Sequence, residues 1–456
     1  MDDYKNIVAE KYSSSDMKYL FSKENIMRTW RQCWIALAEA QNDLGLKQVS
    51  KSQIKELKEN LEKIDLKLIN HYESTLKHDV MAAIMAYGDL CPKAKGIIHL
   101  GATSQFVKCN TDLILQKKAL VIIRNKLLLL LKAFTKLINK TKAIPTLSYT
   151  HFQSAQPTTI GKRFCVYAQD FLMDLEDMDS LEIPFRGVKG TTGTQASFLK
   201  LFNDKSKVQK LDVLVSKKLG FKKVFPISTQ TYTRKLDVKI AFLLANIASS
   251  AKKYTTDLRL LSSLKIIDEP FGKKQVGSSA MPYKRNPIKC ERISSLARKV
   301  MNNLNDFYQV YAEQWLERSL DDSAIRRIDI PENFMLTEYI LDSLIEVVSG
   351  LEIYELVAKN LLEQELPFLA TEDILMECVK KGCDRQEIHE IIKNHSLTVS
   401  QNIKLKGGEN DLLKRLADDK NIPLNENQLK NICFQKSFSG LAEQQCEEFL
   451  KLLNLK

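Results

Sequence analysis

Four long stretches of this sequence contain almost no glycine or proline, the two residues that helices avoid. They span residues 112–144, 231–268, 288–320 and 332–365, and Gly350 is their one interruption. In the last stretch apolar residues recur every three or four positions beside apolar neighbours, which is typical of a helix buried on most sides. A helix of 30 residues is about 45 Å long. Several such helices must pack on one another, so the sequence predicts an elongated bundle in the middle of the chain.

Shorter polar segments separate these stretches. Asp112 is expected to cap the first long helix and Pro145 to mark its end. Strand-type alternation is weak throughout, so the chain is expected to be all-α, with chemistry carried by loops on a helical scaffold. The predicted loops, which hold most of the Gly, Ser, Thr and Pro, span residues 96–104, 149–159, 185–194, 225–232 and 270–287.

The composition limits which classes of protein this chain can belong to. The chain has 456 residues, 44% of them hydrophobic, which is enough for a large core and for two or three domains. Its formal net charge is +12, and the basic excess is spread along the chain. A solvated, lysine-rich surface is the favoured interpretation, and a positive field that attracts a polyanion is the alternative. No nucleic-acid motif accompanies the charge, so no nucleic-acid partner is expected.

Cysteine spacing and apolar runs indicate the compartment. The nine cysteines include no Cys-x-x-Cys pair and no zinc-type spacing, which fits a reducing compartment and predicts no metal site. The N-terminus starts acidic and lacks the apolar core of a signal peptide. The most apolar run, residues 119–131, contains Arg124 and Lys126 and is too short to span a bilayer. We therefore expect a soluble cytoplasmic protein with no membrane partner.

The most unusual segment, residues 277–287, reads Gly-Ser-Ser-Ala-Met-Pro-Tyr-Lys-Arg-Asn-Pro. Two hydroxyls follow a flexible glycine, which suits a mobile loop that closes over an anion. A serine becomes a useful base only where positive charge and donors stabilise its alkoxide. Lys284 is placed to supply that charge, and Asn286 to donate to charge that develops on a substrate carboxylate. A basic surface turn before a helix explains the pattern equally well.

Two further loops carry a histidine among small polar residues. His151 lies within 149–159 among Thr, Gln and Ser, which can fix its tautomer. His99 opens the segment His-Leu-Gly-Ala-Thr-Ser, whose hydroxyls suit a carboxylate. A plain helix N-cap is the favoured role for Thr103 and Ser104, and a lone histidine is more often structural than catalytic.

An arginine-rich segment, residues 315–327, follows the third stretch. It holds Arg318, Arg326 and Arg327, with Ser323 near an expected helix break. Guanidinium groups can bind a phosphate through forked hydrogen bonds. Without other evidence, a salt-bridged surface helix is the favoured interpretation.

Three of these segments resemble a known superfamily. Residues 277–287 resemble the long and specific signature of the fumarase/aspartase superfamily, and residues 101–104 and 150–156 are similar to its two other signature regions, in the expected order. Within this superfamily, the chain resembles the adenylosuccinate lyase family of the animal type. The resemblance covers nearly the whole chain and is weakest after about Ser396. The stretches that carry this second resemblance are residues 28–32, 77–81, 186–197, 320–324 and 365–368.

The resemblance implies a fold, an assembly and a reaction. The implied fold is the all-α, three-domain fumarase/aspartase fold, with an N-terminal domain over 1–103, a central long-helix bundle over 104–354 and a C-terminal domain over 355–456. The implied assembly is a homotetramer whose central helices merge and whose active sites are each built from three subunits. The implied reaction eliminates fumarate from adenylosuccinate and from SAICAR, an intermediate of purine biosynthesis, with no cofactor and no metal.

The resemblance also assigns roles to residues. Ser278 would take a proton from the succinyl arm, and His151 would protonate the departing nitrogen, with His78 beside it on the substrate phosphate. The loop residues that would hold or support the dianionic intermediate are Lys284, Asn286 and Glu291. The residues that would bind the substrate are Lys11, Tyr12, Lys77, Asp79, Thr103, Ser104, Thr150, Gln230, Arg292, Arg318, Ser323 and Arg327.

Three places depart from the family pattern. Lys11 stands where the family usually has an arginine that contacts phosphate, so the charge is kept but the forked hydrogen bonds are lost. Lys108-Cys109 replaces an acidic residue, and Ala83 replaces a frequent histidine. Another lyase of the superfamily and a non-catalytic member are the alternatives. The arginine-rich segment argues against the first, and the joint presence of the expected base and acid argues against the second.

Overall fold

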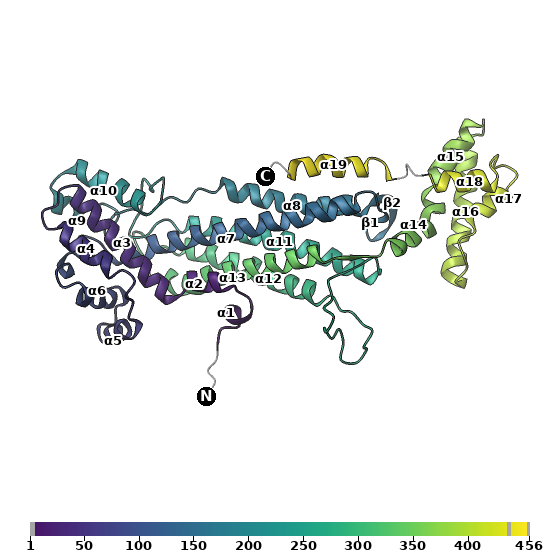
Figure 1. Cartoon of the computed structure of the whole chain (residues 1–456). Coiled ribbons are helices and arrows are strands. Elements are labelled where there is room, and N and C mark those ends of the chain that lie inside the picture. The colour runs from purple at the N-terminus through teal and green to yellow at the C-terminus, as the bar shows by residue number, and fades with distance from the viewer. Residues whose placement is uncertain (1–4, 436–438, 454–456) are drawn as a thin grey trace. The chain divides into compact units, whose positions relative to one another are not determined.

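The computed structural model describes residues 5–435 and 439–453, and nearly all of its regular structure is helical (Figure 1). This confirms the all-α prediction. The helices are α1 (Ile7–Lys11), α2 (Ser15–Leu20), α3 (Lys23–Asp43), α4 (Lys51–Glu59), α5 (Leu66–Leu76), α6 (Asp79–Leu90), the 3-10 helix η1 (Lys95–Ile97), α7 (Ser104–Thr141), α8 (Ile160–Ser180), α9 (Ala196–Phe202), α10 (Lys205–Lys218), α11 (Lys235–Ser263), α12 (Ile288–Ala312), α13 (Asp322–Ser349), α14 (Glu355–Leu369), α15 (Thr371–Lys380), α16 (Arg385–Lys406), α17 (Leu412–Asp418), α18 (Glu426–Cys433) and α19 (Ala442–Leu453). The strands are β1 (Pro145–Thr150), β2 (Gln153–Thr159), β3 (Ile267–Asp268) and β4 (Glu352–Ile353).

The chain folds into two compact units. Their boundaries fall inside the long helices α7, α8, α11, α12 and α13. The predicted division into three domains is not tested by this partition and stays a prediction. Unit 1 comprises Met1–Leu128, Met173–Lys253 and Arg292–Leu344, and unit 2 comprises Leu129–Leu172, Tyr254–Glu291 and Ile345–Lys456.

Helix α3 organises the N-terminal part of unit 1. Ser22 caps it by accepting a hydrogen bond from the Asn25 amide at 3.2 Å. Trp30 and Trp34 are buried along its inner face, and Trp34 stacks on Tyr87 of α6 with ring centroids 6.1 Å apart. Burial of such large rings supplies much of the local packing energy. It therefore fixes the start of α6, where three predicted site residues lie: Lys77, His78 and Asp79.

A separate core in unit 2 anchors the hairpin of β1 and β2. The strands pair antiparallel, with Thr150 opposite Gln153 as the last pair before the turn. Leu147 of β1 belongs to this core, and Tyr149 packs against it. The hairpin therefore rests on helices α14 to α18, whose buried residues include Leu366, Ile374, Ile388, Leu416 and Leu429.

Three predictions about the elements are wrong. Residues 149–159, predicted as a loop, form most of the β1–β2 hairpin, whose strands show no simple alternation of buried and exposed positions. Helix α7 begins at Ser104 rather than at Asp112, because Asp112 pairs with an arginine of α13 instead of capping a helix. Helix α13 begins at Asp322, before the predicted start, and continues through Pro331.

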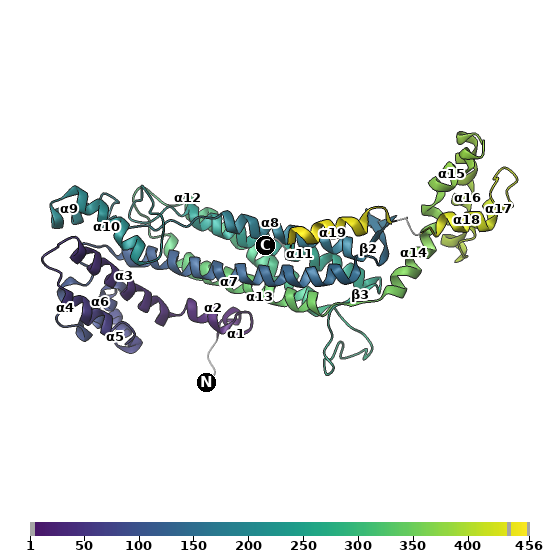
Figure 2. The ribbon, with the colours of Figure 1, turned by 45° about the horizontal axis from the view of Figure 1, so that its top comes forward.

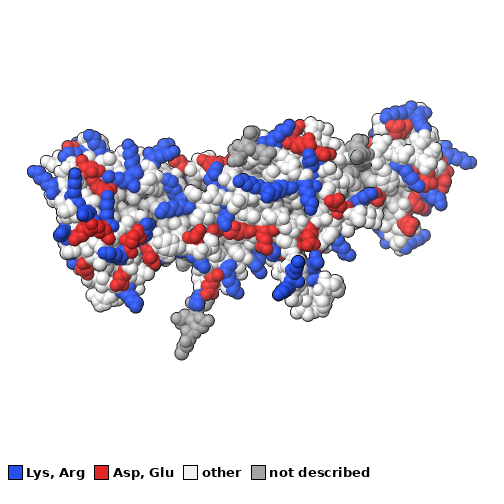
Figure 3. All heavy atoms as spheres, viewed as in Figure 1, with Lys and Arg blue, Asp and Glu red and all other residues white. Residues whose placement is uncertain are grey.

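The distribution of surface charge and the apolarity of the helices bear on which partners the protein could bind. On the face drawn in Figure 3, lysine and arginine are interspersed with aspartate and glutamate over most of the chain. The positive excess is therefore dispersed on that face, as the favoured interpretation of the composition predicts. Within the described residues, no helix is both long enough and apolar enough to cross a membrane.

Candidate active site

The starts of α6 and α7 bring four predicted residues together in unit 1. His78 caps α6, its Nδ1 accepting a hydrogen bond from the Met81 amide at 3.2 Å. In the neutral ring the proton is then on Nε2, which lies 3.5 Å from the Ser104 hydroxyl at the first residue of α7. Lys77 precedes His78 in a left-handed conformation, with a φ of 53°. Thr103 precedes Ser104, and its carbonyl accepts the first hydrogen bond of α7.

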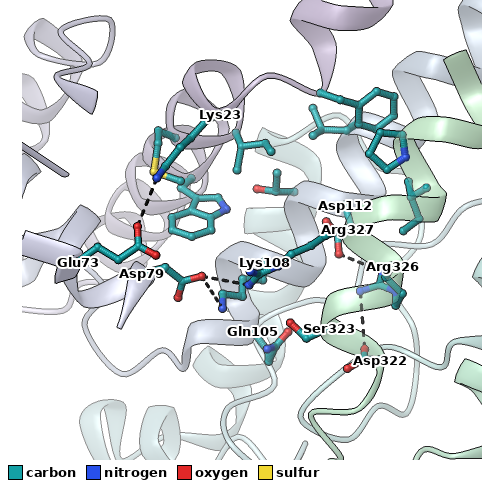
Figure 4. A pocket seen from close by; sticks show the side chains of 18 of the residues that line it. Lys23, Glu73, Asp79, Gln105, Lys108, Asp112, Asp322, Ser323, Arg326 and Arg327 are labelled. Carbon is teal, nitrogen blue, oxygen red and sulfur yellow. Dashed lines mark hydrogen bonds and ion pairs between the residues drawn. The ribbon is translucent and has the colours of Figure 1, made fainter. Parts of the chain in front are cut away.

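Asp79 lies between two cations. Its carboxylate is 2.8 Å from the Lys108 ammonium and 3.3 Å from the Arg327 guanidinium (Figure 4). Burial raises the pKa of Asp79, but the hydrogen bond and charge of Lys108 and the charge of Arg327 outweigh burial and lower it below its ordinary value. Asp79 is therefore ionised at neutral pH and orients both cations.

These residues open into a pocket of about 420 Å³ in unit 1. In Figure 4, Lys108 and Arg327 lie beside Asp79, and Asp322, Ser323 and Arg326 lie near the start of α13, the helix that also carries Arg327. The lining also has an apolar part, which includes Phe21, Ile26, Met27, Trp30, Leu115 and Ile330. A concave site that combines an apolar wall with convergent polar groups is the usual form of a small-molecule site.

Arg326 belongs to a buried network and is not free to bind phosphate. Its guanidinium lies 2.8 Å from Asp237 and 3.0 Å from Asp112, and it donates to the Tyr232 hydroxyl at 2.7 Å. The side chain is 7% exposed. The phosphate interpretation of the arginine-rich segment is therefore wrong for Arg326, which instead ties α7, α11 and α13 together.

Replacing Arg326 with methionine should lower the free energy of unfolding by about 3–5 kcal/mol, because Asp237 would stay buried without its partner. Thermal and urea unfolding measure the loss. Arg327→Met at the next position is the matched control. The Arg327 side chain is 64% exposed, so its loss should change stability by less than about 1 kcal/mol. Similar losses for the two variants would rule out the structural role given to Arg326.

A second ion pair leaves positive charge beside the pocket. Arg234 lies 2.6 Å from Asp322, and Arg318 lies 3.1 Å from the same carboxylate. Arg326 also lies 3.7 Å from it, so one carboxylate serves three guanidinium groups, and the excess charge favours an anionic ligand. The backbone amide of Gln230 donates a hydrogen bond to the backbone carbonyl of Glu317 at 3.2 Å. The loop over 225–232 therefore contacts the segment that carries Arg318. The Asp322-x-x-x-Arg326 spacing was the sequence signal for this network.

Two other predicted residues contact one tyrosine of α13, and a third is next to one of them in sequence. Tyr12 meets Tyr339 edge to face, with ring centroids 5.0 Å apart. Arg292 donates to the Tyr339 hydroxyl at 3.1 Å. Lys11, the last residue of α1, is exposed next to Tyr12. The structure therefore brings Lys11, Tyr12 and Arg292 to one place in unit 1.

In unit 2, His151 lies at the exposed tip of the β1–β2 hairpin. His151 and Phe152 are the two turn residues, with φ values of 52° and 58°. Two positive φ angles in a two-residue turn are the type I′ arrangement that matches hairpin twist. For residues other than Gly and Asn, each costs roughly 1 kcal/mol or more. Strained positions of this kind cluster at functional sites, and Thr150 precedes this one directly.

The segment between β3 and α12 holds Ser278 in unit 2. Figures 1 and 2 show this segment as a long excursion between the end of β3 and the start of α12. The Ser278 hydroxyl oxygen accepts hydrogen bonds from the Ala280 amide at 3.3 Å and the Met281 amide at 3.1 Å. Donors aimed at this oxygen stabilise the alkoxide over the hydroxyl. The loop therefore supplies the donors that a serine base requires.

The same loop is folded back on itself. Gly277 lies so close to the Lys284 carbonyl that any side chain at 277 would overlap it. The Asn286 amide donates to the Gly277 carbonyl at 3.0 Å, whereas the Lys284 side chain is exposed. Asn286 thus braces the turn around Ser278 in this state of the loop. Glu291 follows on α12, where it lies 3.7 Å from Arg259.

A buried glutamate fixes the end of this loop on α12. Glu269 is 5% exposed and accepts hydrogen bonds from the amides of Lys289 at 3.0 Å and Cys290 at 2.9 Å. A carboxylate at a helix N-terminus is stabilised by the free amides and the helix dipole. Sequence reasoning missed Glu269, although an acidic residue before Pro270 was visible.

His99 has a structural role. Its Nδ1 accepts a hydrogen bond from the indole of Trp34 at 2.9 Å. Burial, together with the charge of His78, lowers the pKa of His99 to about 4. His99 is therefore a neutral acceptor at physiological pH, which agrees with the structural interpretation of a lone histidine.

The lowered pKa of His99 should make the protein less stable in acid. Between pH 6.5 and 4 the unfolded chain binds a proton at His99 that the folded chain does not, so stability falls as the pH falls. The loss from pH 7.5 to pH 5 should be about 2 kcal/mol. Urea unfolding of His99→Asn should lack that part of the pH dependence, whereas His389→Gln, on an exposed residue of α16, should retain it. An unchanged slope in His99→Asn would refute the assignment.

Two protein-family models match the chain, one after the other along the sequence. A family model described as "Lyase" matches residues 7–302, and one described as "Adenylosuccinate lyase C-terminus" matches residues 367–449. The chain is 43% identical to the adenylosuccinate lyase of Saccharomyces cerevisiae over 99% of its own length and 94% of that protein. The chain belongs to the adenylosuccinate lyase family. It is therefore a lyase of the fumarase/aspartase superfamily, as the sequence motifs predict.

Other relatives of the adenylosuccinate lyase family extend the match. The Schistosoma mansoni adenylosuccinate lyase is 43% identical, with 98% of this chain and 94% of that protein covered. Among solved structures, the 3-carboxy-cis,cis-muconate lactonizing enzyme from Pseudomonas putida superimposes with a TM-score of 0.84 at 19% identity, covering 99% of each chain. The fumarate lyase from Mesorhizobium sp. BNC1 gives 0.82 at 19% identity, with 99% and 100% covered. These structures confirm the predicted superfamily fold.

Proposed function

We propose that this protein catalyses the elimination of fumarate from adenylosuccinate to give AMP, and from SAICAR to give AICAR, in purine biosynthesis. The observation that carries the proposal is the 43% identity to adenylosuccinate lyases over 99% of the chain. The geometry of the loop around Ser278 and the charge of the pocket in unit 1 support it. Its cysteines within the described residues are all free thiols, which suits a cytoplasmic location.

The proposed chemistry begins at Ser278. Its alkoxide, stabilised by the two loop amides, takes a proton from the methylene carbon of the succinyl arm. The electron pair of that bond is first held by the neighbouring carboxylate, which gives the dianionic intermediate. It becomes the carbon–carbon double bond of fumarate as the carbon–nitrogen bond breaks and His151 gives its proton to the departing nitrogen. Lys284 and Asn286 stabilise the dianionic intermediate, and no step needs a cofactor.

The nucleotide end is proposed to lie in the unit 1 pocket. Six basic and four acidic side chains line that pocket, so its charge favours a phosphate. Ser323 and Arg327 offer donors in the pocket lining. His78, which directly precedes the lining residue Asp79, offers its Nε2 proton next to the Ser104 hydroxyl, just outside that lining. These donors match the acceptors of a nucleoside monophosphate.

We further propose a homotetramer in which each active site draws residues from three subunits. The long helices carry large apolar side chains that are exposed in the single chain. Where exposed apolar side chains of this size form a patch, the patch usually marks a protein–protein interface. The helices α7, α8, α11, α12 and α13 contribute Val121, Leu129, Val166, Met173, Phe242, Leu260, Tyr308, Tyr311 and Ile328.

An ultraviolet assay with the purified protein tests the reaction. Adenylosuccinate should be converted to AMP and fumarate, whereas argininosuccinate and malate should not react. Turnover of argininosuccinate or malate in place of adenylosuccinate would assign the chain to another activity of the superfamily. No turnover of any substrate by a folded tetramer would favour a non-catalytic member.

A further inference from the structure

Lys108 lines the unit 1 pocket and has no role in the proposed mechanism. It lies one helical turn after Ser104 on α7, so the two side chains share a face of the helix. Lys108 lines the pocket together with Arg318, Ser323 and Arg327. The family resemblance assigns it no role, because this place departs from the family pattern.

The contacts of Lys108 leave part of its donor capacity available. Its ammonium has three N–H donors, and the one ion pair that the structure shows for it is with Asp79 at 2.8 Å. The side chain is 21% exposed, so the charge is partly desolvated but still reachable from the pocket. Asp79 also holds Arg327, at 3.3 Å. One carboxylate therefore positions two cations side by side.

Two cations that share one carboxylate form a site for a further anion. With Asp79 ionised, the pair Lys108 and Arg327 keeps a net charge of +1, and Arg318 and Ser323 line the same pocket. A phosphate monoester carries close to two negative charges at neutral pH. It can accept from the ammonium and from the guanidinium at the same time.

We propose that Lys108 is a substrate-binding residue that contacts the phosphate of the nucleotide, with Asp79 as its positioning residue. The proposal rests on the proposed function. Lys108 therefore contributes to affinity for the phosphorylated ligand and takes no part in the proton transfers at Ser278 and His151. Removing its charge should raise KM and leave kcat nearly unchanged.

The test compares Lys108→Met with wild type by calorimetry and kinetics. Binding of AMP needs no turnover, and Lys108→Met should weaken it by roughly tenfold. KM for adenylosuccinate should rise by a similar factor, with kcat within about twofold. Inhibition by fumarate should not change. Lys108→Arg, which keeps a cation, should retain most of the AMP affinity.

Lys118→Met is the matched control, because Lys118 is an exposed lysine on the same helix outside the pocket lining. It should bind AMP like wild type.

Unchanged AMP affinity in Lys108→Met would overturn the proposal and leave the Asp79 pair as a structural contact. Weaker fumarate inhibition with normal AMP binding would also overturn it, because Lys108 would then serve a carboxylate. Wild-type protein that binds AMP but turns over no adenylosuccinate would instead contradict the proposed function.

Discussion

Alanine at Ser278 should reduce turnover of adenylosuccinate by roughly 10³-fold, with the fold and the assembly intact. The hydroxyl oxygen is the atom on which the Ala280 and Met281 amides converge. Without it, no base remains to take the proton from the succinyl arm. Steady-state kinetics measure the loss, and circular dichroism with size-exclusion chromatography checks the fold.

Ser279→Ala is the matched control for this prediction. Ser279 is the neighbouring hydroxyl in the same loop and is exposed. No hydrogen bond of the described residues involves its side chain. Its loss should cost less than about tenfold in turnover. A larger loss at Ser279 than at Ser278 would show that the other hydroxyl is the base.

Replacement of His151 should reduce turnover by roughly 10²- to 10⁴-fold, because the departing nitrogen would lack its proton donor. His151→Asn is the most informative variant. Asparagine tolerates a positive φ, so the hairpin turn should keep its geometry while the acid is lost. Stopped-flow or steady-state assays with adenylosuccinate measure the effect.

Phe152→Asn controls for the turn itself, because Phe152 shares the positive φ and is exposed at the same tip. It should keep turnover within about tenfold of wild type. Near-normal turnover in a folded His151→Asn protein would remove His151 from the mechanism. Equal losses in both variants would indicate that the tip acts through contacts rather than through an acid.

The long helices were predictable because their signal is local. A stretch without glycine or proline and with apolar residues at helical spacing has few alternatives, and α11 and α12 lie where that pattern places them. The loop over 270–287 was equally visible, since it collects glycine, proline and cations between two such stretches. In the described structure no helix or strand falls within it.

The hairpin around His151 could not be predicted in the same way. Its strands mix buried and exposed positions without alternation, and the register shifts between Leu147 and Ser148. Its stability comes from packing on a distant part of the sequence, because Leu147 joins the core of α14 to α18. The turn has no Asn-Gly or Asp-Gly pair to mark it.

The distribution of the arginines shows a second limit. Arg326 and Arg327 are neighbours in sequence, yet one is 7% exposed in a network with Asp237 and the other is 64% exposed beside Asp79. Sequence pattern gives the charge of each residue but not its partner across helices. The motif resemblance assigned a substrate contact to Arg327 and none to Arg326, and that assignment stays a prediction. It gave no role to Lys108, whose contact with Asp79 only the fold reveals.

Subunit complementation tests the central claim most directly, because it requires the reaction, the two catalytic roles and the shared site together. Ser278→Ala and His151→Asn proteins would be mixed in equal amounts, allowed to exchange subunits, and assayed with adenylosuccinate. If the base and the acid of each site come from different subunits, roughly a quarter of the sites should be intact and turnover should recover in proportion. No recovery after exchange has been confirmed by mass spectrometry would contradict the account.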